Sequence, residues 1–151
     1  MNSSVKDRIS SLRFGGSVWC NLDVALRNVD QVFSRAIQPL NLSVIEWYIL
    51  RALFEQDGQH ASELARSVGR AATSFTPNLD KLQKKDLIER QPDPSDRRAV
   101  RIHLTEKARE CRSDIMEVAD DLDEQISGLF SKEDYDKFQT VLATLQSINL
   151  D

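Results

Sequence analysis

The order of short patterns in residues 61–104 constrains the fold more than any other feature of this chain. Apolar residues recur at helical spacing in two stretches on either side of Gly69, namely Ala61, Leu64, Ala65 and Val68, then Phe75, Leu79 and Leu82. Segments 87–91 and 99–104 follow, each with branched apolar residues, and they flank the turn-forming segment 92–98. This order predicts a helix-turn-helix followed by a β-hairpin with a charged tip.

Longer helical patterns lie on both sides of this module. An apolar stripe predicts a long helix from Val18 to just before Pro39. The segment 43–46 predicts a capping box at the start of a helix that runs to about residue 56, with the Glu46 carboxylate reaching back to Ser43. Residues 105–129 predict one helix of about six turns, and residues 131–148 a last helix. These apolar stripes exceed what the module can cover, so we expect a second subunit to cover them.

The composition limits the classes of function. The 151 residues suffice for one compact domain, and no apolar run approaches the about 20 residues of a membrane span. Residues 1–7 lack the apolar stretch of a secretory signal, so we expect a soluble, cytoplasmic protein. Cys20 and Cys111 lie far apart and the chain has 2 histidines, so we expect no metal site and no cofactor. We also expect no enzyme, because the sequence assembles no set of catalytic groups.

The charges are distributed unevenly. The chain carries a formal charge of -4, but residues 60–107 hold 10 Lys and Arg against 7 Asp and Glu, whereas residues 108–151 hold 4 against 11. Such a distribution would turn the central face toward a polyanion and the C-terminal end away from it. It fits equally well a protein whose acidic helices simply keep it in solution, so the charge alone does not decide.

Four stretches carry a resemblance to a known family: 61–65, 73–82, 87–90, and 93–98 leading into 104–107. By their residues, order and spacing over roughly residues 43–108, the chain resembles the MarR family of winged helix-turn-helix transcriptional regulators. The resemblance implies a mainly α fold with a small β-hairpin wing. It divides the one compact unit into an N-terminal dimerisation helix (1–42), a winged helix-turn-helix DNA-binding module (43–107) and C-terminal dimerisation helices (108–151).

The sequence departs from the family pattern at three positions. Asp86 and Ala108 stand where the family usually has glycine, and we expect this to change only local backbone detail. Pro77 lies in the expected recognition helix, where proline is unstrained only near the first turn. We therefore expect that helix to start near Thr73.

The expected recognition helix has side chains suited to the DNA major groove, namely Thr73, Ser74, Thr76, Pro77, Asn78 and Lys81. Asn78 could pair with adenine, and Thr76 and Pro77 could contact a thymine methyl group. Lys81 could bind a phosphate or a guanine edge. Taken singly, the Thr and Ser residues fit helix caps equally well, and Lys81 fits a solvated charge.

The expected wing has its own candidates. The resemblance implies that Asp96 steadies Arg98, that Arg98 enters the minor groove, and that Arg97 and Arg101 meet phosphates. Without the resemblance, two arginines on an exposed turn would fit a solvated loop better. With it, we expect a homodimer that binds a pseudo-palindromic operator in double-stranded DNA.

The resemblance also implies a repressor that is released by a small aromatic or phenolic acid. Trp19, Arg27 and Trp47 are the candidates for that site, because an arginine can hold a carboxylate and an indole can stack. Tryptophans of this kind are more often core or interface anchors. Two alternatives stay open. One is a redox-responsive regulator that uses Cys20, although residues 1–47 contain no tyrosine to hold a thiolate. The other is a winged-helix interaction protein without DNA contact.

Overall fold

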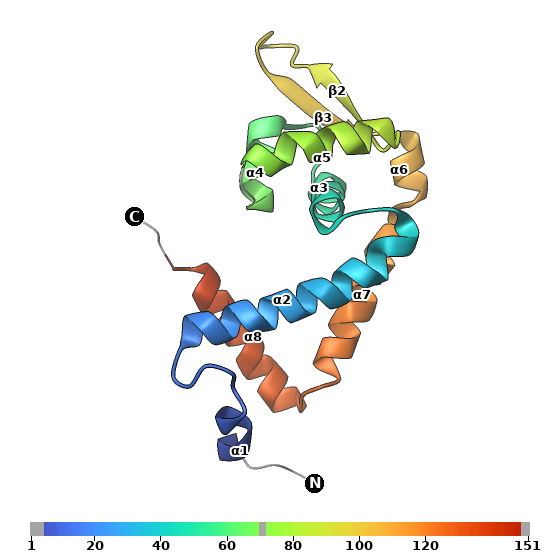
Figure 1. Ribbon diagram of the computed structural model, residues 1–151. Coiled ribbons are helices and arrows are strands. Elements are labelled where there is room, and N and C mark those ends of the chain that lie inside the picture. Colours follow the sequence, from blue (N-terminus) through green and yellow to red (C-terminus); the bar gives the residue numbers. More distant parts are fainter. Residues whose placement is uncertain (1–4, 70–71, 149–151) are drawn as a thin grey trace.

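The computed structural model describes residues 5–69 and 72–148, without the side chains of residues 5, 6 and 72–74. Figure 1 shows a helix-rich molecule in which a hairpin and the helix beside it lie at the end away from α1. The helices are α1 (Val5–Ser10), α2 (Val18–Ile37), α3 (Val44–Glu55), α4 (Ala61–Val68), α5 (Ala72–Lys84), α6 (Glu106–Glu110), α7 (Arg112–Ser127) and α8 (Lys132–Gln146), with a short 3-10 helix at Gln38–Leu40. The strands are β1 (Gln59–His60), β2 (Ile88–Pro92) and β3 (Val100–Leu104).

The long N-terminal helix forms where its apolar stripe predicts it. The Ser17 side chain caps α2 by accepting a hydrogen bond from the Cys20 amide. After Ile37 the chain tightens into the 3-10 turn that contains Pro39, and Asn41 in the left-handed conformation ends that turn. The short helix α1 lies outside the predicted patterns.

The capping box predicted at the start of α3 is only half formed. The Ser43 hydroxyl accepts a hydrogen bond from the Glu46 amide at 3.2 Å, as expected. The Glu46 carboxylate, however, is buried and accepts a 2.5 Å hydrogen bond from the ammonium group of Lys85, the residue just after α5. A contact between residues far apart in sequence therefore replaces the local one.

The helix-turn-helix consists of α4 and α5. Gly69 follows α4 with a φ of +63°, so the predicted glycine stop is confirmed. The expected start near Thr73 is correct to within one residue, since α5 begins at Ala72. Pro77 is nevertheless the sixth residue of α5 and lies beyond the first turn, where it removes one backbone hydrogen bond without ending the helix.

The predicted hairpin is present and belongs to a three-stranded antiparallel sheet of order β1-β3-β2. Ile88 pairs with Leu104, and Pro92 pairs with Val100 at the far end. Asp86, just before β2, has a φ of +60°, so this position requires the left-handed conformation that glycine adopts most easily. The two-residue strand β1 was not predicted.

The predicted helix over residues 105–129 is interrupted. The Thr105 side chain caps its start by accepting from the Ala108 amide, but α6 ends at Glu110 and α7 begins after Cys111. Ala108 is fully buried, whereas Cys111 is only half-buried at the break. Ser131 caps α8 as predicted.

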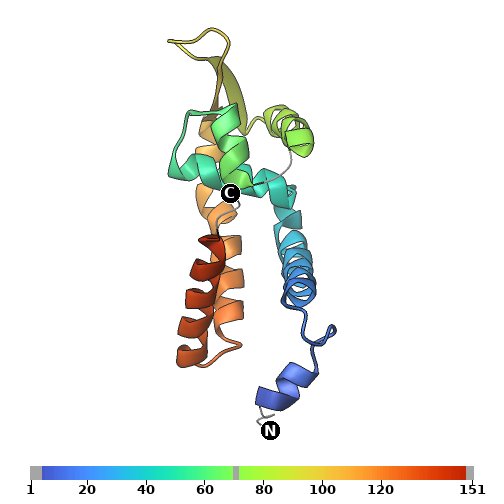
Figure 2. The same ribbon diagram turned by 90° about the vertical axis from the view of Figure 1, so that its left-hand side faces the viewer.

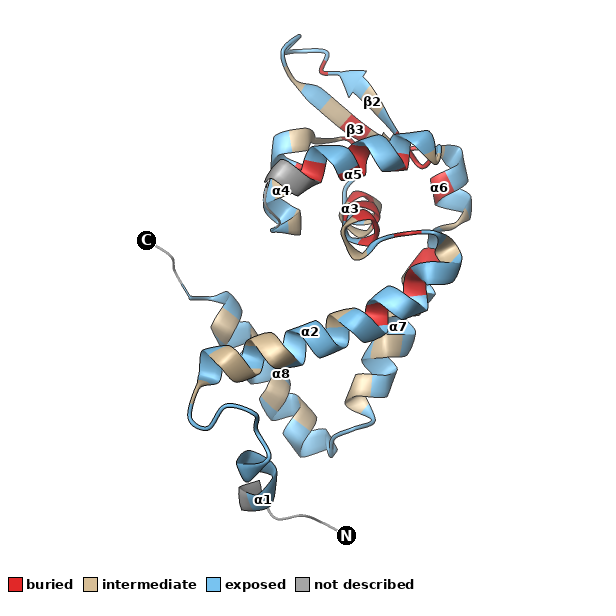
Figure 3. Ribbon diagram, in the orientation of Figure 1, coloured by how far each residue is buried: buried red, intermediate tan, exposed pale blue. Residues whose placement is uncertain are grey.

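The hydrophobic core is concentrated in the central module. Its largest fully buried side chains lie mainly on α3, α4, α5 and the sheet: Ile37, Ile49, Leu50, Leu53, Leu64, Leu82, Ile88 and Ile102. To this core α2 contributes only Phe33 and Ile37, α7 contributes only Ile115, and α8, all of whose residues are described, contributes none. Figure 2 shows α2 on one side and α7 with α8 on the other as two extended arms below the module, and Figure 3 shows how little of them is buried.

Candidate nucleic-acid interface

Helix α5 has one face in the core and one face in solvent. Phe75, Leu79 and Leu82 are buried, as their spacing predicts. Thr76, Pro77 and Lys81 are exposed on the opposite face. The side chains of Thr73 and Ser74 lie outside the described residues. The exposed face of α5 therefore contains three of the six predicted base-reading residues.

Asn78 lies on the other side of the helix. Its side chain is buried, with 8% of the residue exposed, and its Oδ1 accepts a 3.4 Å hydrogen bond from the Ser43 hydroxyl. Ser43 is the cap of α3, so Asn78 faces the α3 side of the module. In this arrangement its amide joins two helices and does not share the solvent-exposed face of α5.

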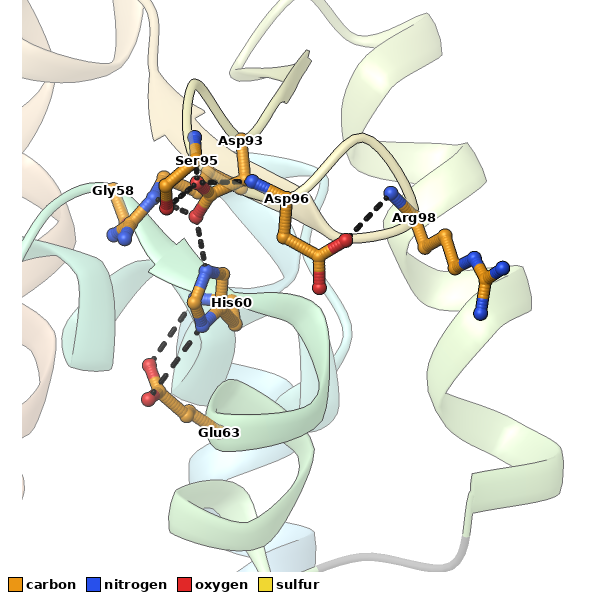
Figure 4. Close-up of polar contacts among 8 residues, drawn as sticks. Gly58, His60, Glu63, Asp93, Ser95, Asp96 and Arg98 are labelled. Carbon is orange, nitrogen blue, oxygen red and sulfur yellow. Dashed lines mark hydrogen bonds and ion pairs between the residues drawn. The ribbon is translucent and has the colours of Figure 1, made fainter.

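The wing tip presents two free arginines. Arg97 and Arg98 are exposed, and neither guanidinium group forms a hydrogen bond or ion pair with any residue that the structure describes. The predicted contact between Asp96 and Arg98 is present, but the Arg98 backbone amide makes it, donating to Asp96 Oδ1 at 3.0 Å. Figure 4 shows the Arg98 side chain extending away from the residues at the base of the wing. Asp96 thus shapes the turn and leaves the guanidinium free.

Arg101 is held within the protein. Its Nε donates to Asp93 Oδ2 at 2.7 Å, and its Nη1 donates to the Gly58 carbonyl at 2.9 Å. Arg101 therefore fastens β3 to the turn before β1 and to the start of the wing. The family resemblance implied a phosphate contact for this side chain.

Asp93 is the buried centre of the wing base. Asp93 is 3% exposed. Its Oδ1 accepts hydrogen bonds from the Ser95 amide at 2.8 Å, the Ser95 hydroxyl at 2.7 Å and the Asp96 amide at 3.3 Å. His60 Nε2 lies 2.5 Å from Asp93 Oδ2. The hydrogen bond with His60, followed by those from Ser95, holds the pKa of Asp93 far below its ordinary value. The wing therefore starts from a carboxylate that stays ionised.

Sequence reasoning missed this role of His60 and Asp93. The two residues are 33 positions apart, and β1, which carries His60 beside the hairpin, is too short to leave a pattern. The one available signal was Asp93 followed by proline and serine, a sequence typical of a side-chain-stabilised turn.

The three predicted effector residues do not come together. Trp19 is 75% exposed near the start of α2, and Arg27 forms a 3.0 Å ion pair with Asp23. Trp47 is buried, and its ring packs edge-on against Phe33 with centroids 4.9 Å apart. Trp47 alone of the three borders a cavity of about 430 Å³ between α2, α3 and α7. That cavity is also lined by Tyr48 and Arg51, which the sequence did not single out.

The described residues contain no group of three or more His, Cys, Asp or Glu side chains placed to hold a metal ion. None of the described helices is both long enough and apolar enough to cross a bilayer. Cys20 and Cys111 are both free thiols.

Comparison with known proteins agrees with this geometry. Residues 42–100 match the model of the MarR family. The chain is similar to the transcriptional repressor CouR in a structure with a 23-mer DNA duplex, at 25% identity and a TM-score of 0.79, over 86% of this chain and 92% of that one. A MarR transcriptional regulator from Methanosarcina mazei is similar at 20% identity and a TM-score of 0.77, over 85% and 92% of the two chains.

A third similar structure is Bordetella bronchiseptica BpsR, whose DNA binding is regulated by 6-hydroxynicotinic acid. It shares 18% identity and a TM-score of 0.82, over 91% of this chain and 98% of that one. The family match covers the helix-turn-helix and the wing, and the structural similarity extends to the long helices on both sides. Residues 42–100 of this chain therefore match the MarR family, and the fold of the chain is that of these similar transcriptional regulators.

Proposed function

We propose that this protein is a sequence-specific, dimeric DNA-binding repressor. A small aromatic acid releases it from its operator. The observation that carries the DNA-binding part is the pair of unpartnered arginines, Arg97 and Arg98, at the tip of a wing that projects beside the exposed face of α5. A cation without an intramolecular partner is available to a phosphate or to the minor groove. The DNA-bound structure of the similar repressor CouR supports this proposal.

Within this proposal α5 lies in the major groove. Thr76, Pro77 and Lys81 face the duplex, and Thr73 and Ser74 are included from the sequence pattern alone. Arg97 and Arg98 contact the minor groove and the neighbouring phosphates. Asn78 and Arg101 are assigned to holding the module together, because the structure engages both side chains internally.

The proposed dimer covers apolar surface that one chain leaves exposed. Large exposed apolar side chains gather on the segments before and after the central module: Ile9, Leu12, Phe14, Val18, Trp19, Leu22, Leu26, Val29, Val32, Leu129, Phe130, Val141 and Ile148. A soluble monomer rarely leaves large apolar patches exposed. A second copy pairing through α1, α2, α8 and the segment between α7 and α8 would bury it and place two α5 helices about 34 Å apart, in successive major grooves.

The proposed effector site is the cavity between α2, α3 and α7. Its volume of about 430 Å³ suits a single aromatic ring with substituents. Trp47 and Tyr48 offer ring surfaces, and the Arg51 guanidinium, already 3.2 Å from Glu55, offers a partner for a carboxylate. The regulation of the similar protein BpsR by 6-hydroxynicotinic acid supports an aromatic acid as the ligand class.

The DNA-binding proposal is tested with a duplex that the protein itself selects from a random pool. We expect Arg98→Ala to weaken binding to that duplex by about tenfold, in line with the 1–3 kcal/mol typical of such a contact. Lys132→Ala, which removes an exposed charge from α8, is the matched control and should leave the affinity within a factor of two. If the protein selects no duplex, or if Arg98→Ala binds like the wild type, the interaction-protein alternative is favoured.

The effector proposal has an independent test. In Trp19→Phe, Trp47 is the only tryptophan, so its fluorescence reports on the cavity. We expect 6-hydroxynicotinic acid or a related aromatic acid to change this fluorescence and to raise the melting temperature. Arg51→Gln should weaken the response. An acid that releases DNA without changing the Trp47 fluorescence would place the effector site elsewhere.

A further inference from the structure

His60 lies between two carboxylates from different parts of the module. It is the last residue of β1 and the cap residue of α4, and its side chain is 29% exposed. Its Nε2 is 2.5 Å from Asp93 Oδ2 at the start of the wing, and its Nδ1 is 3.7 Å from Glu63 Oε1 on α4. Figure 4 shows the ring between these two acidic groups. The imidazole therefore connects the helix-turn-helix to the wing.

The Asp93 carboxylate transmits this contact to the wing loop. Its Oδ1 accepts hydrogen bonds from the Ser95 and Asp96 amides. Its Oδ2 contacts the His60 ring and accepts a hydrogen bond from Arg101. Since the two loop amides and the ring share one buried carboxylate, a change in the hold of His60 on Asp93 alters the anchoring of the loop. That loop presents Arg97 and Arg98.

Charged groups on neighbouring elements surround the ring. Glu63 on α4 and Asp93 in the wing are the acidic groups that contact it. Opposing them is Arg101, which lies across from His60 in the β1–β3 register and shares the same Asp93 oxygen. The other titratable group of β3 on this side is His103, whose ring lies against the Cα of Gly58. The Asp96 amide donates a hydrogen bond to Asp93, and the Asp96 carboxylate accepts one from the Arg98 amide.

We propose that His60 is a positioning residue for the wing, and that protonation of its ring tightens both the wing base and DNA binding. The inference rests on the proposed DNA-binding function. A neutral imidazole can donate one hydrogen bond, whereas an imidazolium ion donates from both nitrogens and carries the charge that strengthens bonds to carboxylates. Histidine is the side chain that ordinarily changes charge between about pH 5 and 8. DNA affinity therefore rises as the pH falls through this range.

The experiment compares the two histidines of the chain, one at a time. Affinity for the selected duplex is measured from pH 8 to pH 6 at constant ionic strength for the wild type, His60→Gln and His103→Gln. The glutamine amide can still donate to Asp93 but does not titrate. We expect the wild type and His103→Gln to tighten by about fivefold, the usual gain when a neutral donor becomes charged, and His60→Gln to change by less than twofold.

A second measurement needs no DNA. The hydrogen-exchange protection factors of the Ser95 and Asp96 amides, corrected for the intrinsic pH dependence of exchange, report directly on the anchoring by Asp93. We expect them to rise from pH 8 to pH 6 in the wild type, to rise less in Glu63→Gln, and to stay constant in His60→Gln. Glu63→Gln keeps the histidine, so it serves if His60→Gln folds poorly.

The inference is overturned if His60→Gln retains the wild-type pH dependence of protection, or if His103→Gln abolishes it. A protein that shows the expected protection but selects no DNA would contradict the proposed function and leave the role of His60 at the wing base intact. A protein that binds DNA with a pH dependence that His60→Gln leaves unchanged would support the proposed function and contradict the role of His60.

Discussion

The indole N–H of Trp47 donates a buried 2.7 Å hydrogen bond to the carbonyl oxygen of Ile115. This bond joins α3, within the helix-turn-helix module, to α7, which runs toward the proposed dimer face. The same ring packs edge-on against Phe33 of α2. One side chain thus links the module to both of its flanking helices, and a ligand in the neighbouring cavity would act where these three helices meet.

Trp47→Phe is expected to lower the free energy of unfolding by about 1–3 kcal/mol. The change removes the hydrogen bond to Ile115 and leaves space where the larger ring packed. Thr76→Ala is the control, because Thr76 lies on the exposed face of α5 and should change stability by no more than about 0.5 kcal/mol. Urea unfolding at a fixed protein concentration measures both. Equal losses in the two variants would refute the anchoring role of Trp47.

Asn78→Ala is expected to affect stability rather than sequence preference. Its buried amide bonds to Ser43, so its removal should cost about 1–2 kcal/mol while the selected DNA sequence stays the same. Thr76→Ala, on the exposed face of the same helix, should do the opposite, preserving stability and relaxing the selected sequence. Selection from a random duplex pool with each variant distinguishes them. A stable Asn78→Ala protein with an altered sequence preference would show that Asn78 reads bases.

Gly58→Ala is expected to destabilise the protein more than Gly69→Ala. Both glycines have a positive φ, +72° and +63°, so alanine is strained at either by about 1 kcal/mol. At Gly58 the new Cβ would also lie 2.9 Å from Cε1 of His103, whereas at Gly69 no atom of the described residues, apart from its chain neighbours, lies within 4 Å of it. Thermal unfolding compares the two variants, and His103→Ala should recover part of the loss in Gly58→Ala. Equal losses without such recovery would argue against the steric contact.

The pH dependence of the unfolding free energy should reveal the contribution of the Asp93 carboxylate. Because the pKa of Asp93 is lowered in the folded protein, its carboxylate stabilises the fold at every pH above its ordinary pKa of about 3.8. That stabilisation is lost as the pH falls below this value toward the lower folded pKa. We expect the wild type to exceed Asp93→Asn in unfolding free energy by an amount that does not fall between pH 7 and 5 and that is smaller at pH 2.5. A difference that already shrinks between pH 7 and 5 would assign the effect to another group.

Most of the fold could be predicted because its signals are local. Ser43, Gly69, Thr105 and Ser131 each act within one helical turn, and all four mark a helix boundary in the structure. The short β1 strand was missed because two residues have no periodicity. The break at Cys111 was missed because the apolar stripe continues through it.

The site could be predicted only where side chains remain free. Arg97, Arg98 and Lys81 are exposed, as their sequence context suggests. Arg101 and Asn78 have the same chemistry but are engaged by partners that are distant in sequence, and Trp47 is engaged by a carbonyl 68 residues away. A sequence motif indicates residue types that can contact DNA, but tertiary contacts decide which of these side chains are free to do so.

The central claim is that two copies of this chain place α5 in successive major grooves and the wings in the flanking minor grooves. Hydroxyl-radical footprinting on the duplex that the protein selects tests it most directly. We predict two symmetric protected segments centred about one helical turn apart, with outer protections that Arg98→Ala abolishes while the inner ones persist. A single unpaired footprint, or a footprint that Arg98→Ala leaves unchanged, would contradict the account.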